Sequence, residues 1–573
     1  MFLRLLTCLL GLGVLAARAE SFPVAIRVDA AKPLGELKPI WRFFGADEPN
    51  YATQPDGRKL LGQLGRLDPG TPVFFRTHNL FTSGDGTAAL KWGSTGVYGE
   101  DGRGRAIFDW STLDVIFDAY RQQGLRPYVQ LGFMPEAMSV HPYPYRHHWK
   151  PGDNYGDIYT GWAYPPKDYV KWEELNYQMA RRYLGRYGNA EIDQWWWEVW
   201  NEPNIPYWKG TPEEYYRLYD YAVAGVRRAL PNARVGGPES TSPRGAGAAK
   251  FLRDFLEHCL RGTNYATGKV GSPIDFIAFH AKGAPTVQEG HVRMGLSAQL
   301  QDFDAGFGLV ASFPELKSLP IVIGESDPDG CAACSSEVYP QNAYRNGALY
   351  ASYTAASFAR AHDLAAKHGV NLAGALTWAF EFEGQPWFAG FRALASRGVE
   401  LPVLNTFRMM AKLHGQRLTV ESPSALALPD VVQSGVRGTP DVSALAARDG
   451  DTVSALVWHY HDDDVVGPEA EVTVSIAGLT PNGRLKLRHY RVDETHSNAF
   501  TVWQKQGSPQ QPTPPQLAEL IKAAALAELE SSLVTVAADG TVPVHFLLPR
   551  QGLSLLVLQP APEAPAGATP NRP

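Results

Sequence analysis

Two glutamates, Glu202 and Glu325, each end an apolar segment with the length and composition of a buried strand. Two carboxyl groups that face each other across a pocket can cleave a glycosidic bond. One protonates the leaving oxygen, and the other attacks the anomeric carbon, so their pKa values must differ. We therefore predict that Glu202 is the acid/base and Glu325 the nucleophile of a retaining glycoside hydrolase.

The surroundings of Glu202 support this interpretation. Four tryptophans precede it, at positions 195, 196, 197 and 200, and an apolar setting beside a second carboxylate favours the neutral acid. Asn201, one residue earlier, is placed to donate a hydrogen bond to a sugar 2-hydroxyl. A single glutamate after a strand is usually a capping or solvated residue. A second one, three strands later, moves the interpretation toward catalysis.

The elements that must position these residues alternate between short apolar strands and helices. Eight such strands predict a closed (β/α)8 TIM barrel of the α/β class. The alternative is a doubly wound open sheet. It is less favoured because this sequence has no Gly-rich phosphate-binding fingerprint after the first predicted strand. The eight predicted strands are Trp41–Ala46, Val73–His78, Arg126–Phe133, Trp195–Asn201, Arg234–Pro238, Asp275–His280, Ile321–Glu325 and Gly374–Phe380.

In such a barrel the carboxyl ends of the strands meet at one mouth, where function resides. Polar and aromatic residues follow the second, sixth and eighth predicted strands as well as the fourth and seventh. We predict that they bind the substrate beside Asn201: Arg76, His78, His280, Lys282, Trp378, Glu381 and Glu383. The chemistry needs carboxylates and water only, so we expect neither a cofactor nor a metal.

The remainder of the chain predicts an accessory domain. After about residue 420 the helical period gives way to β-rich segments separated by turns, which indicates a β-sandwich. Residues Gly507–Pro515 are rich in Pro and Gln, and Ala518–Ser531 is predicted to form a short helix; this region is interpreted as an insertion. The predicted organisation is a signal peptide at 1–19, an N-terminal strand of the sandwich at 20–39, the barrel at 40–415, the β-sandwich at 416–560 and a disordered tail at 561–573.

Composition excludes several classes of partner. The net charge is −6 and the chain has no polybasic run, so it lacks the basic face of a nucleic-acid binder. The apolar leader is too short to span a bilayer and ends in Ala17-Arg18-Ala19, so we expect export to the periplasm or the medium and no membrane anchor. Cys331 and Cys334 form either a small disulfide or a pair of free thiols, and they lack the second pair of a zinc site.

The segment Trp197–Asn204 reads Trp-Glu-Val-Trp-Asn-Glu-Pro-Asn, and Val235–Pro238 follows as Val-Gly-Gly-Pro. These motifs resemble glycoside hydrolase family 39, which unites β-xylosidases and α-L-iduronidases, and the resemblance covers most of the chain. It implies a barrel with the acid/base at strand four, matching Glu202, and the nucleophile at strand seven, matching Glu325. The Thr-Glu-Trp pattern of the xylosidases is absent, because Gly324 and Ser326 flank Glu325.

The resemblance also implies roles for other positions. Arg76 and His78 match a sugar-binding position on strand two, and Trp378 matches the aromatic platform on strand eight. His280 and Lys282 resemble the iduronidase branch, whose strand six ends in His-x-Lys-Gly.

Which sugar the pocket binds depends on the charges that line it. A uronate needs a cation beside its carboxylate, which Lys282 or Arg392 could supply, whereas Glu381 and Glu383 would repel it and suit a neutral sugar. We therefore expect a β-D-xylosidase acting on xylo-oligosaccharides. The alternatives are an α-L-arabinosidase, an α-L-iduronidase-like uronidase and, more remotely, a non-catalytic carbohydrate-binding protein.

Overall fold

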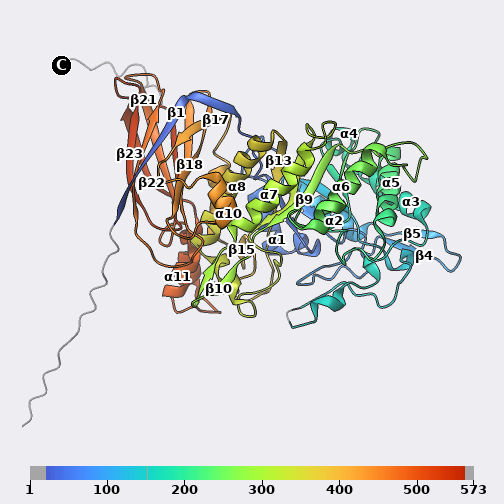
Figure 1. Ribbon diagram of the computed structural model, residues 1–573. Helices are drawn as coiled ribbons and strands as arrows, with labels where there is room; N and C mark the ends of the chain where they lie inside the picture. Colours follow the sequence, from blue (N-terminus) through green and yellow to red (C-terminus); the bar gives the residue numbers. More distant parts are fainter. Residues whose placement is uncertain (1–20, 151, 562–573) are drawn as a thin grey trace, which may run out of the picture.

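The computed structural model describes residues 21–150 and 152–561, and its centre is a barrel of parallel strands (Figure 1). The last strand position is divided, since β13 pairs with β12 while β14 pairs with β2, and this closes the ring. The predicted (β/α)8 barrel is therefore confirmed. Its strands are β2 (Phe43–Ala46), β3 (Val73–Thr77), β6 (Leu125–Leu131), β7 (Trp196–Val199), β8 (Arg234–Ser240), β9 (Phe276–Lys282), β12 (Pro320–Asp327), β13 (Asn371–Ala375) and β14 (Thr377–Trp378).

Helices connect the strands and surround the barrel (Figure 1). The start of α5 follows its sequence closely, because Thr211 and Glu214 form a reciprocal capping box and Pro212 occupies the first helical position. The helices of this region are α1 (Pro55–Leu64), α2 (Ser111–Gln122), α3 (Tyr169–Tyr187), α4 (Asn189–Ile192), α5 (Pro212–Ala229), α6 (Ala246–Arg261), α7 (Leu296–Ala311), α8 (Ala348–His368), α9 (Pro402–Met410) and α10 (Leu428–Ser434).

Aromatic rings fill the floor of the barrel. Trp196 lies 5.8 Å from Phe43 and 4.8 Å from Phe276, measured between ring centroids. Gly236 and Gly374 leave room for these rings, because a Cβ at either position would approach a ring carbon to 2.6 Å. The interior below the carboxyl-terminal mouth is thus a packed core, and any ligand must bind above it.

A second, nine-stranded sheet lies at one side of the barrel, at the left of Figure 1. Side chains from strands at both ends of this sheet share one apolar core, so the sheet folds over on itself. Its order is β22 (Ala527–Thr535), β21 (Arg484–Val492), β24 (Leu553–Pro560), β19 (Thr452–Tyr460), β18 (Asp441–Asp449), β17 (Gln416–Glu421), β1 (Phe22–Glu36), β20 (Ala470–Ala477) and β23 (Val542–Leu548).

The outer face of this sheet packs on the barrel through α8. Tyr353 and Tyr460 lie 6.0 Å apart between ring centroids, and the guanidinium of Arg360 donates to Asp441 at 3.0 Å. The side chains of Leu445, Leu456 and Leu555 belong to the same buried cluster as the barrel. The interface is therefore continuous with the barrel core, as expected of a domain that supports the barrel.

The helix predicted at Ala518–Ser531 is wrong in its second half. Helix α12 (Pro514–Ala524) ends where the Asn405 amide donates to the carbonyl of Ala524 at 2.7 Å, and β22 follows as an edge strand paired with β21. The Ala-, Leu- and Glu-rich sequence favours a helix locally, but pairing with β21 outweighs that preference. A further helix, α11 (Ala499–Lys505), has no counterpart in the sequence prediction. The predicted insertion Gly507–Pro515 runs into the start of α12.

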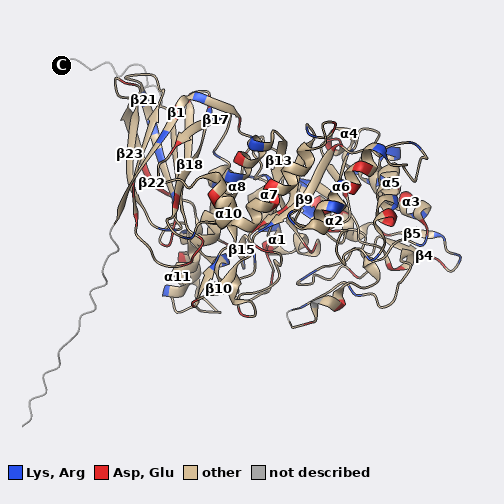
Figure 2. Cartoon of the chain, in the orientation of Figure 1, with Lys and Arg blue, Asp and Glu red and all other residues tan. Residues whose placement is uncertain are grey.

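The predicted signal peptide at 1–19 lies outside the described residues, as does the tail beyond residue 561. Within the described ranges no helix has both the length and the apolar character needed to cross a membrane. Figure 2 shows basic and acidic residues interspersed along the visible helices, with no basic face in that view.

Candidate active site

The side chains at the carboxyl ends of β3, β7, β9 and β12 converge on one cluster. Glu202 follows β7 by three residues, and its backbone N–H donates to the carbonyl of Glu239 at 2.8 Å. Glu325 lies within β12, and His280 and Lys282 lie on β9. Both glutamates are largely buried, with 8% of Glu202 and 4% of Glu325 exposed, so each needs polar partners.

Basic side chains surround the carboxylate of Glu325. The Lys282 ammonium contacts its Oε2, and Nη1 of Arg76 lies 3.5 Å from its Oε1. Nε2 of His78 lies 3.7 Å from Oε1, and Nδ1 of His280 lies 3.8 Å from Oε2. Burial alone would raise the pKa of Glu325, but Lys282, His280 and Arg76 lower it well below its usual value. Glu325 is therefore ionised, as a nucleophile requires.

Glu202 shares two of these partners. Its Oε1 lies 2.8 Å from Nδ1 of His280 and 3.4 Å from the ammonium of Lys282. Carboxylate oxygens of Glu202 and Glu325 approach each other within 4.8 Å, with His280 beside both. The two carboxyl groups are therefore close enough to flank the scissile bond of one bound sugar, one on each side of the anomeric carbon.

The tryptophans before Glu202 do not form its surroundings. Trp195 packs outward against Phe117, at 5.4 Å between ring centroids, and Trp196 points into the barrel floor. Burial does act to raise the pKa of Glu202, but Lys282 and His280 lower it below the usual value. The expectation that Glu202 is held neutral by an apolar wall is therefore wrong for the unliganded protein. Strand alternation sends most of that wall away from the pocket.

Two other predicted residues, Asn201 and Trp378, join the cluster. Asn201 accepts a hydrogen bond from Nη2 of Arg76 at 2.9 Å, and Arg76 stacks over the ring of Trp378 at 4.9 Å. The ring of His78 lies 4.5 Å from that of Trp378, measured between ring centroids. The structure thus brings together the predicted residues of strands two, four, six and seven, together with Trp378.

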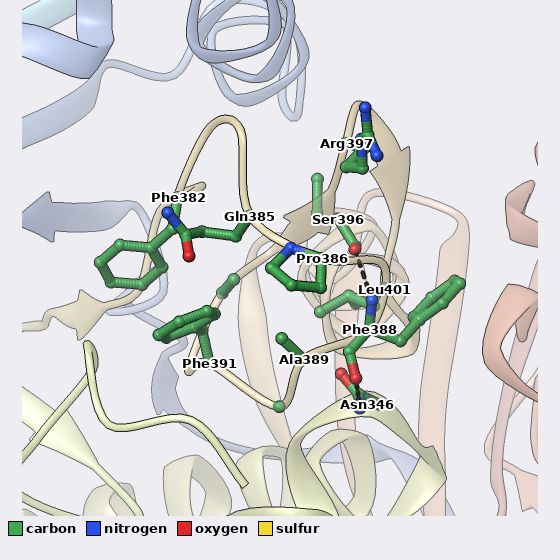
Figure 3. A pocket seen from close by; sticks show the side chains of 13 residues that line it. Asn346, Phe382, Gln385, Pro386, Phe388, Ala389, Phe391, Ser396, Arg397 and Leu401 are labelled. Carbon is green, nitrogen blue, oxygen red and sulfur yellow. Dashed lines mark hydrogen bonds between the residues drawn. The ribbon is translucent and has the colours of Figure 1, made fainter. Parts of the chain in front are cut away.

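Glu381 and Glu383 lie elsewhere, which corrects their predicted placement. The carboxylate of Glu381 accepts from the N–H of Gly398 at 2.6 Å, and that of Glu383 from the N–H of Gly57 at 3.4 Å. The strand ends at Trp378, and the chain then turns away from the mouth. The next residues enclose a cavity of about 20 Å³ beside Phe382 and Phe391 (Figure 3), which has room for about one water molecule and not for a sugar.

Arg392, considered above as a ligand for a uronate, is fully buried among acidic groups. Its Nη2 lies 3.3 Å from Asp327, and its Nη1 lies 3.1 Å from Asp329. Asp329 also binds Arg345, which donates to the carbonyls of Cys331 and Cys334. These two cysteines form a disulfide, which resolves the alternatives left by the sequence.

Three acidic residues of the site were missed by the sequence reasoning. Asp47, after β2, accepts from the indole N–H of Trp378 at 3.1 Å and from Lys91 at 3.1 Å. Glu198, on β7, contacts Nε of Arg76, and Glu239, on β8, lies 3.1 Å from Nε2 of His280. A survey of the ends of all eight strands, including the first and fifth, would have found Asp47 and Glu239.

The cluster also contains the donor types of a metal site. One atom each from Glu202, His280 and Glu325 lie within 4.8 Å of one another, and carboxylate and imidazole bind zinc. However, Lys282 contacts both carboxylates and Arg76 approaches Glu325, so a divalent cation would meet two positive charges. We therefore assign no metal to this cluster.

The fold and the site define a (β/α)8-barrel protein with paired carboxylates at its mouth. Residues 24–541 match the family model described as Glycosyl hydrolases family 39, and the chain belongs to that family. The protein is thus a glycoside hydrolase.

Two activities recur among the relatives that match most of this chain. The chain is 25% identical over 509 residues to a β-xylosidase of Caldicellulosiruptor saccharolyticus, covering 87% of this chain and 91% of the relative. It is 26% identical over 537 residues to the α-L-iduronidase of Mus musculus, covering 87% and 75%. The fold is similar to that of the family 39 enzyme from Xanthomonas axonopodis pv. citri, with a TM-score of 0.71, 22% identity and coverage of 96% and 100%.

Proposed function

We propose that this protein is a retaining β-D-xylosidase that releases xylose from xylo-oligosaccharides by double displacement. The observation that carries the mechanism is that a carboxylate oxygen of Glu202 lies within 4.8 Å of a carboxylate oxygen of Glu325. Carboxyl groups about 5–5.5 Å apart are typical of retaining enzymes, whereas inverting enzymes hold theirs about 6.5–9.5 Å apart to admit a water. In this proposal Glu325 attacks the anomeric carbon while Glu202 protonates the leaving oxygen.

A neutral sugar is supported because the basic side chains that could bind a uronate are already paired with carboxylates of the protein. Lys282 contacts both carboxylates of the pair, and Arg392 is buried between Asp327 and Asp329. A uronate carboxylate would have to compete with these acidic groups. Glu381 and Glu383 do not influence the choice of sugar, since neither lies in the cluster. The similarity to bacterial β-xylosidases also supports a xyloside.

A uronidase remains the second candidate, because the side chain of Lys282 is 15% exposed beside the carboxylate pair. A substrate carboxylate that displaced it from Glu325 would gain a charge-assisted contact. The similarity to α-L-iduronidases, at 26–27% identity, gives this candidate independent support.

Hydrolysis of nitrophenyl glycosides tests both candidates. We expect release from the β-D-xyloside, slower release from the α-L-arabinoside and none from the α-L-iduronide. Release from the iduronide alone would overturn the xylosidase proposal and leave the carboxylate pair intact. Proton NMR of the first product separates the mechanisms, because retention gives β-xylose first and inversion gives α-xylose first.

A further inference from the structure

Glu239 lies beneath the carboxylate pair and fills the space beside the predicted nucleophile. It is fully buried on β8, and its Oε2 lies where a side chain at Gly324 would begin. A Cβ added to Gly324 would come 1.7 Å from this oxygen. Glycine is therefore the residue that fits before Glu325, because a third carboxylate occupies that space.

His280 links this carboxylate to Glu202. Its Nε2 lies 3.1 Å from Oε2 of Glu239, and its Nδ1 lies 2.8 Å from Oε1 of Glu202. An imidazole that donates from both nitrogens is an imidazolium, which suits a position between two carboxylates. The titratable groups that face His280 and its two carboxylate partners come from five strand positions. They are Glu202, Glu239, Glu325, Lys282, Arg76 and Glu198.

We propose that Glu239 is a positioning residue that keeps His280 protonated, and that His280 stores the proton which Glu202 delivers to the leaving group. The proton moves from Nδ1 of His280 to Oε1 of Glu202, and the neutral imidazole still donates from Nε2 to Glu239. Glu202 then passes the proton to the glycosidic oxygen as that C–O bond breaks and Glu325 bonds the anomeric carbon. In the second half-reaction, water attacks that carbon, and its proton returns through Glu202 to His280.

The electrostatics of the cluster agree with this order. Burial alone would raise the pKa of Glu239, but Arg76, Glu198 and His280 lower it to about 2, so Glu239 is ionised. Burial and Glu239 raise the pKa of Glu198 well above its usual value, so Glu198 is neutral. Burial opposes the charged form of His280, but Glu325, Glu202 and Glu239 together raise its pKa. In the unliganded protein the proton is therefore held by His280 and not by Glu202.

The test compares Glu239→Gln, Glu239→Asp and Tyr128→Phe on whichever glycoside the wild type hydrolyses. Tyr128→Phe is the matched control, because it removes the 2.8 Å hydrogen bond to Oε1 of Glu239 without changing its charge. In Glu239→Gln we expect the alkaline limb of kcat/KM for a poor leaving group to move down by about one pH unit. At pH 7, kcat/KM for that substrate should fall about tenfold, while a dinitrophenyl glycoside should lose less than about twofold. Glu239→Asp should restore much of the limb, and Tyr128→Phe should not move it.

Equal losses on both leaving groups with an unmoved limb would overturn the proposal. Nitrogen NMR of histidine in the wild type provides a test without any substitution: His280 should be an imidazolium at pH 7, and a neutral ring would also overturn the proposal. The proposal rests on glycoside hydrolysis but on no particular sugar. These outcomes can therefore be interpreted even if the substrate is not a xyloside.

Discussion

The ammonium group of Lys282 lies on the carboxylate of Glu325, and the same group reaches Glu202 at 3.4 Å. One cation thus stabilises the ionised form of both glutamates. Since Lys282 lowers the pKa of each glutamate, its removal should raise both.

The first prediction concerns that cation. In Lys282→Met, the acid limb of kcat/KM should move to higher pH, because Glu325 would take up a proton more readily without its partner. The pH profile on the best nitrophenyl glycoside measures this shift. Lys250→Met is the control, since Lys250 is exposed on α6 and pairs with Asp254 on the same helix. An unmoved acid limb in Lys282→Met would show that Arg76 and His280 suffice to keep Glu325 ionised.

The second prediction separates the two roles of the carboxylate pair. Glu325→Gln should lose kcat on every substrate, because no covalent intermediate can form. Glu202→Gln should lose about 10²–10⁴-fold on a poor leaving group and should form the intermediate normally from a dinitrophenyl glycoside. Burst kinetics distinguish these outcomes. Glu383→Gln is the matched control, and a comparable loss there would mean that Glu383 reaches the sugar after all.

The third prediction follows from the shared space of Gly324 and Glu239. Gly324→Ala should displace the Glu239 carboxylate from His280 and lower kcat/KM. In a Glu239→Ala background that space is open, so the added methyl group should cost much less. The double-mutant cycle should give a coupling of about 0.5–3 kcal/mol, the range for residues in contact. Additive losses would show that the two positions do not exclude each other.

The fourth prediction is a pH dependence of stability at Glu381. Burial, despite the hydrogen bond from Gly398, raises the pKa of Glu381 to about 8. A raised carboxyl pKa means that the folded state keeps a proton which the unfolded chain releases, so stability falls as the pH rises from about 4.5 to 8. Glu381→Gln should remove that component, and its melting temperature should exceed that of the wild type more at pH 8 than at pH 5. Glu257→Gln, an exposed residue of α6, should show no such difference.

The barrel could be read from the sequence because its strands are buried on both faces and each is a short, nearly continuous apolar run. The residues at the ends of those strands could also be predicted as site residues, since this fold places the carboxyl ends of its strands at one mouth. This explains why Glu202, Glu325, Arg76, His280 and Lys282 lie together in the structure.

The directions in which side chains point within that mouth were harder to predict from the sequence. The tryptophans before Glu202 alternate across the strand, so their number said little about its surroundings. Glu381 and Glu383 were misplaced because the chain leaves the barrel at Trp378, and no residue type marks that exit. The strand β22 was read as helix because its partner β21 lies about forty residues earlier and local sequence does not encode that pairing.

The second sheet has a consequence for synthesis. Strand β1 is at the start of the described chain, yet its neighbours β17 and β20 both follow the last barrel strand and helix α9. While the chain emerges from the ribosome, the barrel is complete before β1 has anything to pair with. An unpaired apolar strand is a site for association with other chains. A nascent chain stalled after the barrel would therefore expose β1, and only translation of the C-terminal strands would cover it.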